Sequence, residues 1–246
     1  MFTHHILHLV KDFGTFKSEI HPVLLIDNDE RILFDAGYPG QAEDIARELA
    51  RHGLKVKDLT MIVVSHHDHD HIGSLLALKI MHPAVRIVAG RSEADYIAGK
   101  KISLRLQQAE EHNKTLGGSE LEFGERFAAY LKTIDICPVD RLVDDGEHLS
   151  EGVRVISTPG HTPGHISLYI EEQGIFIAGD ATAVENGRLI LPNPQFTLDM
   201  SMALDSIRRI QSLKINSIIN YHGGIYSGDI VNALGRVLAA NSSLQA

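Results

Sequence analysis

The chain has 246 residues, of which 43% are hydrophobic and 22% charged, an ordinary composition for a folded protein with ample material for a core. Its formal charge of −9 argues against a nucleic-acid-binding protein, which normally shows a basic footprint. No apolar stretch approaches the ~18–20 residues of a membrane span, and the start, MFTHHILHLVKDFG, lacks the features of a signal peptide. The single cysteine, Cys137, excludes an intramolecular disulfide and favours a cytoplasmic location, and we expect it to be a small buried side chain.

The first part of the chain alternates between strand-like and helix-like segments. It predicts strands over 22–26 and 31–34, a helix within 39–53, a buried strand over 59–66, a second helix over 73–83 and a strand over 84–90. The strand over 59–66 contains the apolar run MIVV, whose β-branched residues favour a strand buried on both faces.

Residues 101–132 differ from their surroundings, because they are charged, helix-prone and interrupted by Gly117–Gly118. This pattern predicts a helical insertion that covers one edge of the core. Whether it is a substrate lid, or a surface through which a homodimer forms, stays open at this point.

From residue 141 onward, short strand-like runs are separated by turn residues, and helices are predicted over 198–213 and 227–241. Strands and helices therefore alternate through both halves, which predicts the α/β class. Because no repeat or low-complexity linker divides the chain, we expect one domain over 1–246.

The stretch SHHDHDHIGS, residues 65–74, places four histidines and two aspartates in ten positions after an apolar run. Three other strand-like runs also end on such a residue, namely His161, Asp180 and His222. Burying these polar groups costs several kcal/mol unless each is paired or bound to a metal. Four such endings together predict a metal site, with either a His67, His69, His71 register or a staggered one of His66, Asp68, Asp70 and His71.

These motifs resemble those of the metallo-β-lactamase superfamily of metallohydrolases. The resemblance runs in the family's order from LFDAG (33–37) through SHHDHDHIGS, STPGHTPGHISLYI (157–170) and IAGD (177–180) to NYHGG (220–224). It implies a four-layer αββα sandwich, two mixed sheets flanked by helices, with a dinuclear metal site at one edge. No single motif is specific, but the ordered set is.

The family's motif is His-x-His-x-Asp-His followed by x-Gly, and Asp70-His71 and Gly73 anchor its register here. The first histidine is then His66, and Asp68 replaces the second one. The resemblance implies a first metal on His66, Asp68 and His161, a second on Asp70, His71 and His222, and Asp180 bridging the two. In this register His67 and His69 point away from the metals, and each either supports the ligands or lies at the surface.

The implied donor set is of mixed nitrogen and oxygen character without a thiolate. Zinc accepts such a set, whereas the carboxylate at 68, which has precedent in flavodiiron-type relatives, shifts the preference towards iron or manganese. Two divalent ions, zinc first, are therefore expected, with iron and manganese left open.

Three nearby residues have weaker assignments. Asp35 of LFDAG matches a position that usually supports the metal ligands by hydrogen bonding. His165 is either such a support or a helper near the substrate. Tyr221 precedes His222 on a strand, so alternation predicts that it points to the opposite face, and no role is assigned to it.

The resemblance implies a hydrolase in which a metal-bridging hydroxide attacks a polarised carbonyl, with Asp70 as the catalytic residue that orients the nucleophile and relays a proton. The expected substrate is an ester, thioester or lactone of a small molecule, and neither nucleic acid nor a membrane is an expected partner. The alternatives are an iron-dependent oxidoreductase of the flavodiiron or sulfur dioxygenase kind, and a phosphodiesterase.

Overall fold

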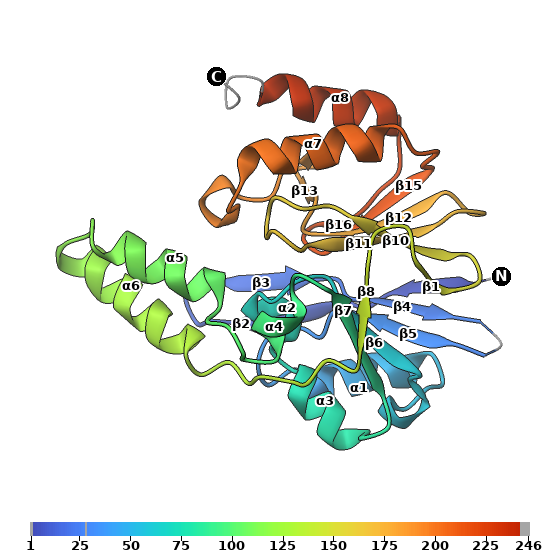
Figure 1. Cartoon of the computed structure of the whole chain (residues 1–246), viewed down its shortest axis with the longest axis horizontal. Coiled ribbons are helices and arrows are strands. Elements are labelled where there is room, and N and C mark those ends of the chain that lie inside the picture. The colour runs from blue at the N-terminus through green and yellow to red at the C-terminus, as the bar shows by residue number, and fades with distance from the viewer. Residues whose placement is uncertain (1, 28, 242–246) are drawn as a thin grey trace.

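The computed structural model describes residues 2–27 and 29–241 and folds them into two stacked β-sheets with helices on both outer sides (Figure 1). The first sheet has the order β1 (Thr3–Ile6), β4 (Val23–Ile26), β5 (Arg31–Phe34), β6 (Met61–Val64), β7 (Arg86–Gly90) and β8 (Arg141–Val143). The second has the order β16 (Gly224–Tyr226), β15 (Ser217–Asn220), β12 (Ile175–Gly179), β11 (Ile166–Ile170), β10 (Val153–Ser157) and β9 (His148–Ser150). Both sheets are mixed, since β5 to β8 run parallel to one another, as do β12 and β15. The predicted αββα sandwich is confirmed.

Strand β6 is buried on both of its faces. Met61 and Val63 face the second sheet, whereas Ile62 and Val64 face the helices on the other side. All four side chains are therefore buried, which explains the continuous apolar run that the sequence shows. The strand ends where its core contacts end, and the polar stretch follows at once.

Helices close the two outer faces. Helices α1 (Ala42–Arg51) and α3 (Leu75–Met81) pack on the first sheet, and α7 (Met200–Gln211) and α8 (Ile230–Ala240) pack on the second. Cys137 is 1% exposed and lies in the core between the first sheet and helices α1 and α3. Burial raises the pKa of its thiol to about 11. No helix among residues 2–27 and 29–241 is long and apolar enough to cross a membrane.

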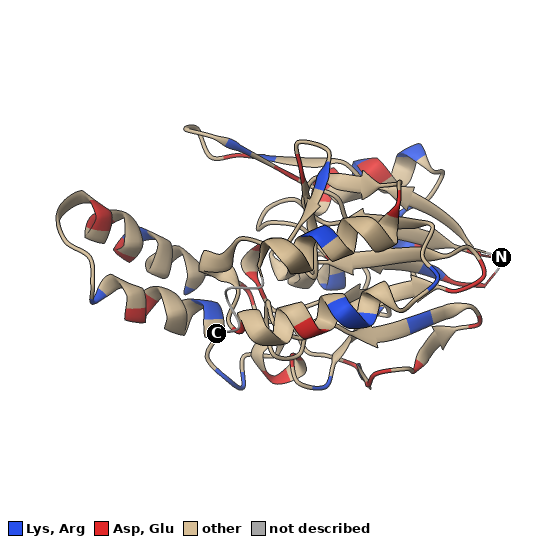
Figure 2. Cartoon of the chain, turned by 90° about the horizontal axis from the view of Figure 1, so that it is seen from above, with Lys and Arg blue, Asp and Glu red and all other residues tan. Residues whose placement is uncertain are grey.

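The segment 101–132 forms a helical hairpin of α5 (Leu104–Asn113) and α6 (Gly118–Leu131) that projects from the body beside the sandwich (Figures 1 and 2). Acidic and basic residues both occur along its two helices (Figure 2). The start of α5 lies against the body, and that end carries Arg105, which is 2% exposed.

Several short elements were not predicted. They are the strands β1, β2 (Leu9–Asp12), β3 (Lys17–Ile20), β13 (Ala183–Glu185), β14 (Arg188–Ile190) and β16, the helices α2 (His69–Ile72) and α4 (Ala94–Ile97), and the 3-10 turns Val56–Asp58 and Pro194–Phe196. The β13–β14 hairpin turns on Asn186 and Gly187, which both have positive φ. Asn-Gly is a strong hairpin signal, so this element was within reach of the sequence.

Candidate metal centre

The polar residues that follow β6, β10, β12 and β15 come together at one edge of the sandwich. Asp180 follows β12 directly and His222 lies two residues after the end of β15, and these two strands are parallel neighbours that end side by side. The loop after β10 brings His161, and the segment after β6 brings the remaining residues. The seven predicted site residues are His66, Asp68, Asp70, His71, His161, Asp180 and His222.

Their side chains form three overlapping groups in which all candidate ligand atoms lie within 4.8 Å of one another. The groups are His66, Asp68 and His161; Asp70, His71 and His222; and His66, His71 and Asp180. The first two match the two metal positions that the family resemblance implies. We call them the first half-site and the second half-site.

Asp180 lies between the two half-sites. Its Oδ1 is 3.5 Å from His71 Nε2, and its Oδ2 is 3.5 Å from His161 Nε2 and 3.6 Å from His222 Nε2. One carboxylate thus faces histidines of both half-sites, which is the arrangement that a bridging ligand requires.

Donor atoms at the centre fit a metal better than they fit one another. His66 Nε2, His71 Nε2 and Asp180 Oδ1 are buried, and none has a hydrogen-bond partner among the residues that the structure describes. The facing nitrogen–oxygen pairs are 3.2 to 3.8 Å apart. Two atoms bound tetrahedrally to one zinc ion at ~2.0–2.1 Å are ~3.4 Å apart, so the cluster has the right size.

Asp35 and Ser65 hold two of these histidines from behind. Asp35 Oδ2 is 2.9 Å from His71 Nδ1, and Ser65 Oγ is 2.9 Å from His66 Nδ1. The Ser65 amide and hydroxyl both donate to Asp35, which locks the pair together. These contacts leave each Nε2 free to face the centre, which is how supports of metal-bound histidines act. Burial, followed by the neighbouring His71, lowers the pKa of His66 to about 3, so this ring is neutral.

Backbone geometry at two positions builds this pocket of ligands. Asp35 has a φ of 68°, which is uncommon for a residue other than glycine and turns its carboxylate towards the cluster. Gly73 closes the motif because a Cβ there would lie 2.2 Å from the backbone nitrogen of Pro39. The x-Gly of the motif is therefore a packing requirement of the turn after α2.

His67 and His69 lie outside all three groups, as the staggered register predicts. His67 is 3% exposed, which excludes the predicted alternative of a surface position. Its Nδ1 pairs with Glu93, and its Nε2 accepts a hydrogen bond of 3.2 Å from the amide of Leu104. The His69 ring lies 5.6 Å from Tyr38 and 5.5 Å from Tyr130, centroid to centroid.

Glu93 ties together the two loops that carry the first half-site. Its Oε2 accepts from the His67 amide at 3.1 Å, and its Oε1 accepts from the Thr162 hydroxyl and the Gly164 amide, each at 2.8 Å. The residue is fully buried. Burial alone would raise the pKa of this carboxyl, but His67, Thr162 and Gly164 lower it. Sequence reasoning missed Glu93, which lies between the predicted elements and matches no motif.

His165 supports the site and does not face its centre. It is fully buried, its Nε2 accepts a 2.9 Å hydrogen bond from the Asp180 amide, and its Nδ1 is 2.8 Å from Thr158 Oγ1. Of the two predicted roles, the contacts match that of a support.

Tyr221 corrects one sequence-based inference. Strand β15 ends at Asn220, so alternation no longer applies one residue later. The Tyr221 hydroxyl donates to the Asp70 carbonyl at 2.5 Å, and its ring lies 3.9 Å from the His71 ring. The side chain therefore packs against the second half-site and holds its backbone.

Arg105, from the start of α5, is the other missed residue. Its guanidinium donates two hydrogen bonds to Asp68 Oδ2, from Nε at 3.0 Å and from one terminal nitrogen at 2.6 Å. Burial alone would raise the pKa of Asp68, but Arg105 and the adjacent histidines hold it well below its usual range. A lone arginine in a charged helical segment carries no signal that distinguishes it from a solvated one.

Comparisons with known proteins match this arrangement. The family model of the metallo-beta-lactamase superfamily covers residues 19–222. The chain belongs to the metallo-β-lactamase superfamily. It is 30% identical over 206 residues to YflN of Bacillus subtilis, a probable metallo-hydrolase, covering 78% of this chain and 75% of that one. A metallo-beta-lactamase family protein of Thermus thermophilus has a similar fold, with a TM-score of 0.73, 21% identity and coverage of 98% and 79%.

A hydroxyacylglutathione hydrolase of Synechococcus is 25% identical over 189 residues, covering 76% of this chain. The chain spans 58% of that relative's length. These relatives show that this metallo-β-lactamase superfamily member is a metal-dependent hydrolase, without naming its substrate.

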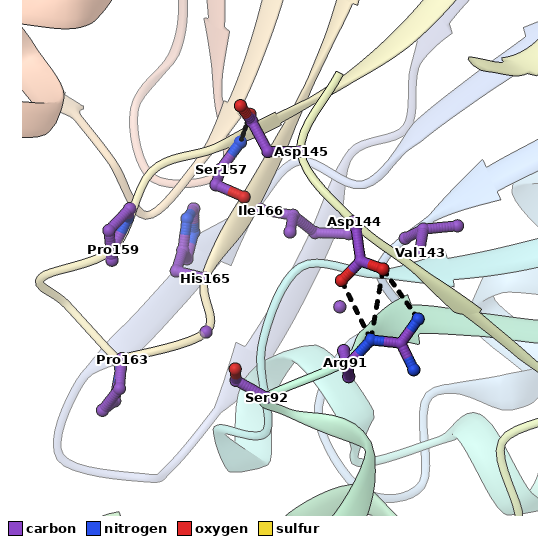
Figure 3. A pocket seen from close by; sticks show the side chains of 12 residues that line it. Arg91, Ser92, Val143, Asp144, Asp145, Ser157, Pro159, Pro163, His165 and Ile166 are labelled. Carbon is purple, nitrogen blue, oxygen red and sulfur yellow. Dashed lines mark hydrogen bonds and ion pairs between the residues drawn. The ribbon is translucent and has the colours of Figure 1, made fainter. Parts of the chain in front are cut away.

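A small pocket of about 90 Å³ lies beside the loop after β10 (Figure 3). His165 lines it, but none of the seven site residues does. Its charged side chains are already paired, since Arg91 binds Asp144 on the pocket wall and Asp145 accepts from the Ser157 amide at 2.8 Å. We therefore assign no ligand to this pocket.

Proposed function

We propose that this chain is a hydrolase that holds two divalent metal ions, zinc first, in the seven-residue cluster and cleaves an ester, thioester or lactone of a small molecule. The observation that carries the proposal is the position of Asp180, whose two oxygens face histidines of both half-sites. When bound, the metals supply a water that ionises near neutral pH and a charge that polarises the substrate carbonyl.

Asp70 is the residue that we assign to proton handling. Its Oδ2 is 3.2 Å from His222 Nε2, and its Oδ1 is 3.8 Å from His69 Nδ1. Asp70 therefore lies between the ligand cluster and the His69 ring outside it. Burial alone would raise the pKa of this carboxyl, but His71, His69 and His222 hold it low, so the group stays ionised. An ionised carboxylate in this position would orient the attacking water and relay the proton released there to the leaving group of the substrate.

The organic part of the substrate has an aromatic neighbourhood beside Asp70. The rings of Tyr38, Phe127 and Tyr130 all lie within 5.8 Å of the His69 ring. The Tyr130 hydroxyl oxygen beside them is buried and has no hydrogen-bond partner among the described residues. Such surroundings favour a small organic acyl compound over a bare ion.

Among the three bond types, a thioester has support from the relatives named hydroxyacylglutathione hydrolase. The mixed histidine and carboxylate donors suit zinc, the first choice here. The cytoplasmic location expected from the single cysteine stays a prediction.

The test compares zinc-loaded and chelator-stripped protein on an acylglutathione thioester, an aryl ester, a lactone and a phosphodiester. We expect zinc-dependent turnover of at least one of the first three. We also expect Asp180→Ala to lower both its zinc content and its kcat/KM, the latter by about a thousandfold, because metals contribute several kcal/mol to such reactions.

The matched control is Asp205→Ala, which removes an exposed carboxylate of α7 that pairs with Arg208. It should keep both zinc and turnover. An Asp180→Ala protein that keeps full turnover would contradict the proposal. Tightly held iron with oxygen consumption and no hydrolysis would replace it with the oxidoreductase alternative.

A further inference from the structure

Arg105 reaches the cluster from the helical hairpin and not from the sandwich. Ser103 begins α5 by accepting a hydrogen bond from the Leu106 amide, and the Leu104 amide donates to His67. The first turn of α5 is therefore fixed against the motif after β6. This anchoring directs the Arg105 side chain inward, where it is almost completely buried.

The guanidinium is held from several sides. Besides its two bonds to Asp68, a terminal nitrogen donates to the Phe196 carbonyl at 2.6 Å, and Gln108 accepts from the other one. The Phe196 ring lies 5.2 Å from the guanidinium carbon. These contacts fix the position of the Arg105 guanidinium within the site, as is typical of a buried arginine that pairs with a carboxylate.

Arg105 binds the oxygen of Asp68 that faces the first half-site. Asp68 Oδ2 is 3.2 Å from His161 Nε2 and 3.5 Å from His66 Nε2. The same terminal nitrogen of Arg105 is 3.4 Å from His161 Nε2. A permanent cation thus shares the donor atoms that the first metal would use, whereas the second half-site has no arginine or lysine among its described contacts.

Arg105 also changes the net charge of the candidate metal site. With Asp68, Asp70 and Asp180 ionised, the seven residues carry −3, and Arg105 reduces this to −2. If position 68 were a histidine, the seven residues without Arg105 would also carry −2, because only Asp70 and Asp180 would be charged. Arg105 therefore cancels the extra negative charge that Asp68 brings to the metal position.

We propose that Arg105 makes the two metal positions unequal, by competing with the first metal for Asp68 Oδ2 and repelling its charge. This inference rests on the proposed two-metal function. The second half-site is then occupied first and holds its metal more tightly, and the first half-site fills only at higher metal concentration.

The experiment titrates chelator-stripped protein with Zn²⁺ by calorimetry, and with Co²⁺ by visible absorption as a second readout. Wild type should show two binding events whose dissociation constants differ by about a hundredfold. In Arg105→Gln the weaker event should tighten by about tenfold or more, the size of effect known for residues that contact metal ligands, while the tighter event moves less than about threefold.

Arg105→Lys keeps the positive charge and should retain two unequal events. Arg209→Gln is the matched control. Arg209 lies on α7 and also pairs with a carboxylate, that of Asp145. It should bind like wild type. Circular dichroism and urea unfolding confirm that each variant is folded.

Asp68→His provides a prediction of opposite sign. It leaves the buried Arg105 without its carboxylate, so the weaker event should weaken further by about tenfold, and Asp68→His with Arg105→Gln should restore it. Two binding events of equal affinity in wild type would overturn the inference but not the proposed function. The same holds if Arg105→Gln leaves the affinity of the first half-site unchanged or weakens it. A wild type that binds no zinc or cobalt would overturn the proposed function and the inference with it.

Discussion

The two half-sites are built from the same residue types but are held by different parts of the molecule. Asp35 and Tyr221 support the second half-site, whereas Ser65 contacts His66 of the first half-site and His71 of the second. All three lie at or next to strand ends of the sandwich. The first half-site depends on Glu93 and Arg105, which lie in or near the helical segments outside the two sheets.

One fold can therefore keep one metal position constant while the neighbouring metal position changes. A ligand supported by strand ends is fixed by the same core that fixes the fold. A ligand supported by an inserted hairpin can be altered by changes in that hairpin without disturbing the core. We therefore expect variation in metal affinity to concentrate in the first half-site.

The largest expected effect comes from removing a histidine that the groups share. His71 belongs to two of the three groups, whereas His161 belongs to one. His71→Ala should lose both zinc ions and about a thousandfold in kcat/KM, because metals contribute several kcal/mol. His161→Ala should lose activity but retain close to one zinc per chain, as measured by plasma mass spectrometry. Equal zinc loss in both variants would contradict the separation into half-sites.

A smaller effect is expected from the supports behind the ligands. Asp35→Asn should weaken zinc at the tighter position by about 10–100-fold, the usual cost of removing such a partner. Glu93→Gln should instead lower the free energy of unfolding by about 1–3 kcal/mol, because buried donors of two loops lose their charged acceptor. Zinc titration and urea unfolding of both variants separate the two roles. If Glu93→Gln weakened only the tighter position, the assignment of supports would be wrong.

The smallest effect is expected from Tyr221→Phe. The ring remains against His71, but the Asp70 carbonyl loses its hydrogen bond, which should cost about 1 kcal/mol of stability. Zinc content should stay within error of wild type, since no ligand atom is removed. Urea unfolding with and without zinc measures both quantities, and loss of zinc on this change would show that the hydroxyl does more than hold the backbone.

Much of the fold follows from local pattern. The MIVV run of β6, the helix over 42–51 and the helical hairpin are all visible in the spacing of apolar residues and in the position of glycines. Strands β1 to β3 are not, because their sequences THHI, LVKD and KSEI mix polar and apolar residues, unlike the apolar run of β6.

The candidate site divides in the same way. The resemblance of the ordered motifs to the family implied the seven residues that the structure brings together, and the parallel strands β12 and β15 deliver two of them to one edge. Arg105 contacts Asp68 across 37 positions of the chain, and Tyr221 contacts Asp70 across 151. Contacts of this kind depend on how the elements pack, so local spacing cannot predict them.

Anomalous diffraction from crystals grown with zinc and collected at the zinc absorption edge locates the two metal positions. We expect two peaks among the seven residues, one on each side of Asp180, with the stronger one beside His71 and His222. A peak beside His67 or His69, or no peak within the cluster, would contradict this expectation.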